Sequence, residues 1–237
     1  MRGSTDTDHR GRYTATALVF AGGRNRRMGR DKAFIPVRGM PLIEKILSQL
    51  KPRFSEILLC VSDAERYRRL GVPLVVDEKP SRGPLGALMS GLRASRNEVS
   101  FAVACDIPEI DPAFLDHMFG FVGDYDIVVP TTGFGKYEPC FALYKKSLIP
   151  VIEDLLDRER CKMNLLFSLC RTRCVRIPDD SWYFNLNREE DLKRYENHMA
   201  EKEQHERSIG SGAPSSSVIK EHCFRPGSLI PPAYNNR

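Results

Sequence analysis

Residues 16–32 read TALVFAGGRNRRMGRDK, an apolar run followed by two glycines and a basic stretch. The apolar run 16–21 predicts a buried strand. Gly22 and Gly23 carry no Cβ atom, so the chain can turn there and its N–H groups can approach a ligand closely. The spacing matches neither GxxxxGK[ST] nor GxGxxG, and an ordinary glycine turn before a solvated basic loop is the alternative to a phosphate site.

The basic stretch holds most of the chain's excess positive charge. Five basic residues and one acidic residue lie between Arg24 and Lys32, a local charge of +4 in a chain of net charge +5. A nucleic-acid-binding protein would spread basic side chains along a face, because it must neutralise several phosphates in a row. The concentrated charge favours one small polyphosphate, with Arg27 offering a planar fork of donors and Lys32 a compact cation.

Apolar runs alternate with amphipathic runs from residue 16 to about Tyr195. The expected strands are 16–21, 56–61, 72–76, 99–105, 126–130, 140–144, 173–177 and 183–186. The expected helices are 42–50, 85–94, one that opens near Asp111 and Pro112, 147–157, 162–170 and one that starts near Arg188. This alternation predicts an α/β fold, with three layers (α/β/α) around a mostly parallel, Rossmann-like sheet.

The composition is that of a globular protein, with 41% hydrophobic and 28% charged residues among 237. We expect a flexible N-terminus over 1–13, one folded domain over 14–199 and a flexible tail over 200–237, where polar and then Pro-, Gly- and Asn-rich sequence follows. No run reaches the roughly 18 apolar residues that span a bilayer, and the start lacks a secretory pattern, so a cytoplasmic location without a membrane partner is expected. The seven cysteines contain no CxxC pair, which predicts reduced thiols and no structural metal.

A second polar signature ends the predicted strand 99–105. Asp106 follows Cys105 directly, and Pro108 stiffens the turn after it. An aspartate in this position lies at the carboxyl edge of the sheet, where its oxygens suit Mg²⁺ together with substrate phosphates and water. A polar strand end is the simpler reading of Asp106 alone. Together with the basic stretch, it indicates the metal-and-polyphosphate apparatus of nucleotidyl or phosphoryl transfer.

Two further features follow the predicted strand 72–76. Asp77 closes that strand and could accept hydrogen bonds from a ribose, although a turn-forming Asp is the plainer interpretation. Gly83, Pro84 and Leu85 form a turn with little side chain, against which a flat base could lie, although an ordinary helix start is the simpler reading of these residues in isolation.

Five blocks of the sequence, in this order, resemble the molybdenum cofactor guanylyltransferase family. The resemblance runs from about residue 16 to residue 195 and differs from the family in its last block, where Arg188, Glu189 and Glu190 replace the common TPE after the asparagine. The blocks are AGGRNRRMGRDKAF (21–34), GPLGAL (83–88), CDIP (105–108), EPCFALYKKSL (138–148) and FNLNREEDL (184–192).

The resemblance implies a nucleotide-diphospho-sugar transferase-like fold and Mg²⁺-dependent transfer of GMP from GTP to the phosphate of molybdopterin, with release of pyrophosphate. It implies that Arg27, Lys32 and Asp106 are catalytic, with Asp106 as the Mg²⁺ ligand. The implied nucleotide- and pterin-binding residues are Phe20, Ala21, Gly22, Gly23, Lys32, Asp77, Gly83, Pro84, Leu85, Asp106, Asn185 and Asn187.

The resemblance also implies the partners: GTP, molybdopterin or the molybdenum cofactor, and molybdoenzymes or their chaperones, for a monomer or small homo-oligomer. The glycine pair after Ala21 and the turn 83–85 favour GTP over CTP. Two alternatives stay open. One is a related nucleotidyltransferase that uses CTP or another phosphate acceptor, and the other is a non-catalytic GTP-binding module in cofactor delivery.

Overall fold

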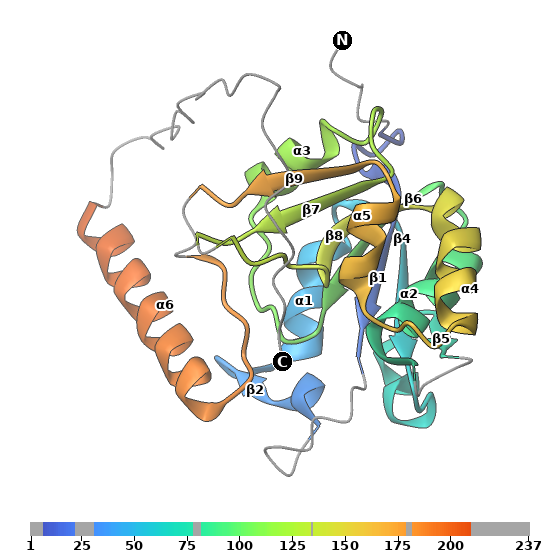
Figure 1. Ribbon diagram of the computed structural model, residues 1–237. Coiled ribbons are helices and arrows are strands. Elements are labelled where there is room, and N and C mark those ends of the chain that lie inside the picture. The colour runs from blue at the N-terminus through green and yellow to red at the C-terminus, as the bar shows by residue number, and fades with distance from the viewer. Residues whose placement is uncertain (1–6, 22–30, 78–81, 134, 179–181, 210–237) are drawn as a thin grey trace. The chain divides into compact units, whose positions relative to one another are not determined.

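A seven-stranded sheet forms the centre of the fold, with neighbours in the order β5-β4-β1-β6-β8-β7-β9 (Figure 1). The computed structural model describes residues 7–21, 31–77, 82–133, 135–178 and 182–209. The strands of the sheet are β1 (Tyr13–Phe20), β4 (Phe54–Val61), β5 (Leu74–Val76), β6 (Val99–Ala104), β7 (Ile127–Thr131), β8 (Phe141–Lys145) and β9 (Thr172–Arg176).

The sheet is mostly parallel, as the sequence predicts. β1 pairs in parallel with β4 on one side and with β6 on the other, so that Phe20 lies opposite both Cys60 and Ala104. β8 runs antiparallel to β6 and to β7, while β7 and β9 are parallel to each other. The carboxyl ends of β5, β4, β1 and β6 therefore meet along one edge.

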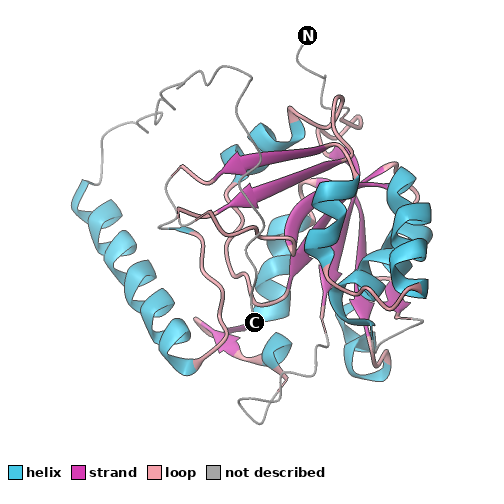
Figure 2. Cartoon of the chain, in the orientation of Figure 1, coloured by secondary structure: helices cyan, strands magenta, loops and turns pink. Residues whose placement is uncertain are grey.

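Helices cover both faces of the sheet (Figure 2). Their bounds are α1 (Leu42–Leu50), α2 (Gly83–Ala94), α3 (Pro112–Phe119), α4 (Ile149–Asp157), α5 (Leu166–Leu169) and α6 (Glu189–Ile209). On β1, Ala17 and Val19 face a core that includes α1 and α3, and Leu18 and Phe20 face a core that includes α2 and α4. The two cores follow from the alternation of side chains along a strand and confirm the predicted α/β/α layers.

Local sequence explains how several elements begin. Asp111 accepts a hydrogen bond from the backbone N of Phe114 (2.7 Å), and Pro112 occupies the first turn of α3, as predicted. Gly83 begins α2 with a φ of +63°, which glycine adopts without strain. None of the helices in the described ranges is long and apolar enough to cross a membrane.

The structure corrects several predicted elements. Residues 183–186 form no strand, and 162–170 form a 3₁₀ turn, η5 (Met163–Leu165), followed by the short α5. Three further 3₁₀ turns, η1 (Lys32–Phe34), η2 (Glu65–Leu70) and η4 (Lys146–Leu148), and the small hairpin of β2 (Pro36–Val37) and β3 (Met40–Pro41) were not predicted.

The chain divides into two units, Met1–Met199 and Ala200–Arg237. The structure describes part of each of the two segments expected to be flexible. Residues 200–209 continue helix α6, and residues 8–12 form a turn in which Asp8 accepts hydrogen bonds from the backbone N of Arg10 and Arg12. The rest of the predicted tail lies outside the described residues.

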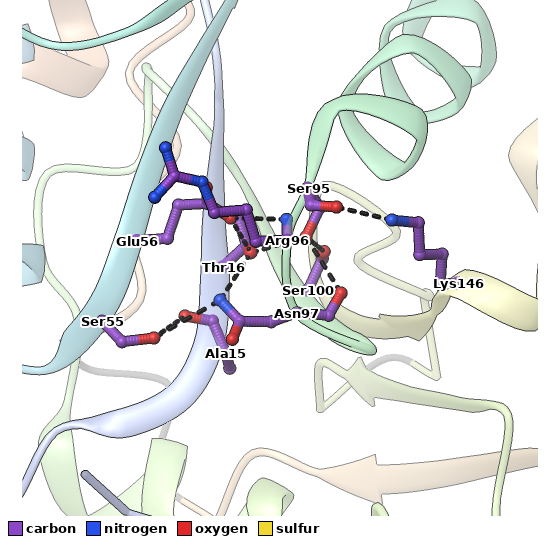
Figure 3. A network of polar contacts seen from close by, with 9 residues as sticks. All are labelled: Ala15, Thr16, Ser55, Glu56, Ser95, Arg96, Asn97, Ser100 and Lys146. Atoms are coloured by element: carbon purple, nitrogen blue, oxygen red, sulfur yellow. Dashed lines mark hydrogen bonds and ion pairs between the residues drawn. The ribbon is translucent and has the colours of Figure 1, made fainter.

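A polar network, buried at Thr16, Ser95 and Ser100, joins the amino-terminal halves of β1, β4 and β6 to the segment after α2 (Figure 3). The Thr16 hydroxyl donates to Glu56 Oε2 (2.6 Å), and the Asn97 side chain donates to Thr16 Oγ1 (3.0 Å). Lys146 Nζ donates to the carbonyl of Ser95 (2.5 Å). The network satisfies polar groups inside the sheet layer, and it lies toward the strand ends opposite the carboxyl edge.

Candidate active site

Lys32 is the buried cation of the carboxyl edge. It begins the 3₁₀ turn η1, and only 8% of its surface is exposed. Its Nζ donates a hydrogen bond to Asn187 Oδ1 (2.8 Å) and lies 3.9 Å from Asp106 Oδ2. A lysine this deeply buried needs anionic or polar partners, and those partners come here from two distant segments of the chain.

Asp106 lies just past β6, beside the carboxyl end of β1. Its Oδ1 is buried and has no hydrogen-bond partner among the described residues. Burial raises the pKa of its carboxyl, the Lys32 ammonium opposes that rise, and the charge of Glu138 adds to it. A buried carboxylate oxygen without a partner destabilises the folded protein unless a cation or a hydrogen-bond donor lies against it.

The segment 183–188 brings two predicted asparagines to the same place. The backbone N of Leu186 donates to the carbonyl of Asp106 (2.8 Å), and the Asn187 side chain donates to Asn185 Oδ1. Asp191 then accepts from the backbone N of Asn187 and of Arg188 (3.0 and 2.9 Å), which fixes the start of α6. Lys32, Asp106 and the two asparagines are therefore gathered by contacts that the fold itself makes.

The predicted nucleoside-side residues follow β5, on the same edge of the sheet. Asp77 continues the sheet by donating its backbone N to the carbonyl of Val61 (2.9 Å), and it borders a cavity between α2 and α4 that Ser90, Arg93 and Glu153 also line. Gly83 and Pro84 are exposed at the start of α2, whereas Leu85 is fully buried in the core. Leu85 can therefore offer a ligand only its backbone.

The remaining predicted residues are the last residue of β1 and residues that follow it in the sequence. Ala21 is buried, and its backbone N donates to the carbonyl of Cys60 (2.9 Å). The Phe20 side chain packs in the core on the side of α2. Gly22, Gly23 and Arg27 lie outside the described residues.

Sequence reasoning assigned no role to Glu138, which is only 7% exposed. Its Oε2 accepts a hydrogen bond from the Tyr183 hydroxyl (3.0 Å), and its Oε1 pairs with the exposed Lys136 (3.2 Å). Its charge acts on Asp106, so a second carboxylate borders the site. The signal was available, because Glu138 begins EPCFALYKKSL, the fourth of the five blocks that carry the family resemblance.

The cysteines beside the site are poor nucleophiles. Burial raises the pKa of the Cys140 thiol to about 12, and burial together with the Asp106 charge also raises the pKa of Cys105. Both thiols are therefore protonated near neutral pH, and the thiolate is the reactive form. The arrangement can hold phosphates and a cation, and these two cysteines supply no covalent chemistry.

The sequence is similar to those of known proteins. The model of the MobA-like NTP transferase domain matches residues 17–172. A Carboxydothermus hydrogenoformans protein named "Probable molybdenum cofactor guanylyltransferase" is 33% identical over 180 residues, covering 75% of this chain and 88% of its own length. The Serratia proteamaculans "Molybdenum cofactor guanylyltransferase" is 31% identical over 185 residues, covering 76% and 93%.

A solved structure shows the same fold. It is the molybdopterin-guanine dinucleotide biosynthesis protein A of Archaeoglobus fulgidus, with a TM-score of 0.68, 22% identity and coverage of 78% of this chain and 99% of that one. The family match, over residues 17–172, includes Lys32 and Asp106, and the relatives are matched over most of their length. The chain therefore belongs to the MobA-like NTP transferase family and is a nucleotidyltransferase.

Proposed function

We propose that the protein transfers GMP from GTP to the phosphate of molybdopterin, with Mg²⁺, and releases pyrophosphate. One observation carries the proposal: Lys32, Asp106 and Asn187 meet at the carboxyl edge of the sheet in a chain of this family. The names of the relatives support the guanine nucleotide and the molybdenum cofactor as substrates.

The residues present fit a divalent cation. Asp106 offers a buried carboxylate oxygen that no described group satisfies. Among the described residues, no group of three or more His, Cys, Asp or Glu side chains could hold a metal ion. Mg²⁺ is commonly held by one or two carboxylates together with phosphates and water. When bound, it would neutralise charge on the triphosphate.

Lys32 and Arg27 would hold the triphosphate. The Lys32 Nζ lies 3.9 Å from Asp106 Oδ2, just past β6, and is already desolvated, so its charge acts on a phosphate with little screening by water. Its present partners, Asn187 and Asp106, keep it pointed into the site. Positive charge there would stabilise the α-phosphoryl group and the departing pyrophosphate.

The nucleoside would lie toward β5. Asp77 follows β5, and Asp106 follows β6, three strand positions away in the sheet. A ligand that reaches both must extend over about 14 Å, because neighbouring strands lie about 4.8 Å apart. A nucleoside triphosphate is such a ligand, with its ribose at Asp77, its base against the turn of Gly83, Pro84 and the Leu85 backbone, and its phosphates at Lys32.

The reaction needs no general base on the protein. An oxygen of the ionised molybdopterin phosphate forms a bond with the α-phosphorus of GTP, and the bond from that phosphorus to the oxygen bridging to the β-phosphate breaks. Pyrophosphate leaves with that electron pair. The acceptor would approach from the side of Asn185 and Asn187, and positioning with charge stabilisation would supply most of the acceleration.

Pyrophosphate release tests this proposal. The protein is incubated with Mg²⁺ and GTP, CTP or ATP, with and without molybdopterin, and we expect release only from GTP with molybdopterin. Release from CTP, or from GTP with another phosphate acceptor, would make the protein a different nucleotidyltransferase. Tight GTP binding without release would favour a non-catalytic module that delivers the cofactor.

A further inference from the structure

Asp31, the residue before Lys32, is anchored on two sides. Its Oδ1 accepts a hydrogen bond from the backbone N of Ala33 (3.2 Å), which caps the 3₁₀ turn η1. Its Oδ2 accepts a hydrogen bond from the Tyr67 hydroxyl (2.9 Å). Arg66 Nη1 lies 3.6 Å from the same oxygen, but its side chain is more than half exposed, so water screens that pair.

Tyr67 is the buried hydrogen-bond partner of Asp31. It belongs to η2, which follows β4, and only 1% of its surface is exposed. Its ring packs in the core beside Phe34, with ring centroids 5.3 Å apart. Burial and the Asp31 carboxylate raise the pKa of its hydroxyl, which therefore stays a proton donor. A tyrosine fixed in this way holds its hydroxyl in one place.

The hydrogen bonds of Asp31 with Tyr67 and Ala33 fix the backbone on both sides of Lys32. Asp31 is held by Tyr67, and Ala33 is fully buried and bonded to Asp31. We propose that Tyr67 is a positioning residue, which acts through Asp31 to hold the Lys32 ammonium where it meets the triphosphate. The inference rests on the proposed role of Lys32 as a triphosphate ligand. Three neighbouring strands of the sheet precede the residues around the Lys32 ammonium. In the chain, β1 precedes Lys32, β6 precedes Asp106, and β4 precedes Tyr67.

The chain offers a matched control. Tyr13 is 7% exposed, and its hydroxyl donates to Asp116 Oδ1, so it is also a buried tyrosine bonded to an aspartate. It begins β1, at the strand end opposite the site, and its ring stacks on Phe119. Removing either hydroxyl removes the same kind of bond, but only one of the two bonds touches the segment of Lys32.

The test measures GTP affinity in the presence of Mg²⁺ and thermal stability for Tyr67→Phe and Tyr13→Phe. Both variants should lower Tm, by about 5 °C each, because each loses a hydrogen bond to a charged group. Tyr67→Phe should also raise the Kd for GTP about tenfold, because small displacements of a charge-stabilising group are costly. Tyr13→Phe should leave that Kd unchanged. A structural role alone would lower Tm without changing the affinity of the folded protein.

A double variant separates this inference from the proposed function. If Tyr67 acts through Lys32, then Tyr67→Phe causes no further loss of GTP affinity in a Lys32→Met protein. Wild-type affinity in Tyr67→Phe, or an additive loss in the double variant, would overturn the role of Tyr67. Wild-type affinity in Lys32→Met would instead overturn the proposed role of Lys32. Should Tyr67→Phe fold poorly, Asp31→Ala removes the same bond from its more exposed end and should give the same loss of affinity.

Discussion

Lys32 and Asn187 lie 155 residues apart in the chain and share a hydrogen bond of 2.8 Å between Nζ and Oδ1. The bond joins the turn after the first strand to the segment before the last helix. An amide oxygen is a neutral partner, which leaves the charge of Lys32 available to an anionic ligand. The pair therefore links the two ends of the folded domain at the point where the triphosphate is proposed to bind.

The charge of the side chain at position 187 should control GTP binding. Asn187→Asp places a carboxylate at hydrogen-bond distance from the buried ammonium, where it would form an ion pair and compete with the phosphates. We expect the Kd for GTP to rise at least about tenfold, which corresponds to about 1.4 kcal/mol. Asn187→Ala adds no further charge beside the ammonium, which already lies 3.9 Å from Asp106 Oδ2, and should weaken GTP binding less, as titration calorimetry on both variants would show. Equal affinities for the two variants would contradict this account of the pair.

Asp106 should be needed for turnover but not for folding. Asp106→Asn removes a desolvated charge and keeps the shape of the side chain, so the protein without ligands should be at least as stable as the wild type. The rate should fall by at least about a thousandfold if the carboxylate places the cation. Thermal melting with GTP should show a Mg²⁺-dependent rise in Tm for the wild type and none for the variant. A variant that kept most of its activity in Mg²⁺ would remove Asp106 from the site.

Substitutions at two glycines of α2 should separate an effect on GTP binding from an effect on core packing. Gly83 has a φ of +63° and open space where a Cβ would stand, so Gly83→Ala should cost only about 1 kcal/mol of stability through backbone strain. In Gly91→Ala the new Cβ would lie 2.8 Å from Leu18 Cδ1, which should cost about 1–3 kcal/mol through overpacking.

GTP affinity distinguishes these two changes. Only Gly83→Ala should weaken GTP, because only that position lies in the turn proposed to face the base. Denaturant unfolding and GTP titration of both proteins check the pair of expectations. A loss of GTP affinity in Gly91→Ala at least as large as in Gly83→Ala would argue against the base lying at this turn.

The pH dependence of stability has a clear source away from the site. Arg171 Nε and Nη2 donate to Asp126 (3.1 and 3.0 Å), and this pairing lowers the pKa of the Asp126 carboxyl below its ordinary value of 3.8. A lowered folded-state pKa contributes stability that is present above pH 3.8 and is lost as the pH falls through the folded-state pKa. Asp126→Asn should therefore be less stable than the wild type at pH 7, and the difference should vanish in acid. Urea unfolding at several pH values measures it, and turnover at pH 7 should not change.

The sequence predicted the fold better than it predicted the details of the site. The alternation of apolar and amphipathic runs was sufficient to predict the α/β/α layers. Asp111-Pro112 was sufficient to predict the start of α3. The direction of β8 is not encoded in an apolar run, so the antiparallel strand could not be placed from the pattern. Residues 183–186 were expected to form a strand, but the rings of Tyr183 and Phe184 pack against Phe141 and Tyr195 instead. The backbone N of Leu186 bonds to Asp106 rather than to a strand.

The candidate site likewise contains residues that the sequence could predict and residues that it could not. Asp106 could be proposed from its position after a strand, whereas Asn185 and Asn187 came only from the family resemblance, because nothing local distinguishes them. Glu138 begins one of the five blocks without a signal of its role, and Tyr67 lies in none of them. Their burial and their partners depend on elements that meet only in the folded chain, through Tyr183 for the first and Asp31 for the second.

The most direct measurement follows the α-phosphate of GTP. The protein is incubated with Mg²⁺, molybdopterin and GTP labelled at the α-phosphorus, and the products are separated. We predict that the label moves to molybdopterin in the wild type, and that Asp106→Asn and Lys32→Met both fail to move it although both remain folded. Label that stays in GTP, or that moves equally well in either variant, would contradict the assignment of guanylyl transfer to this site.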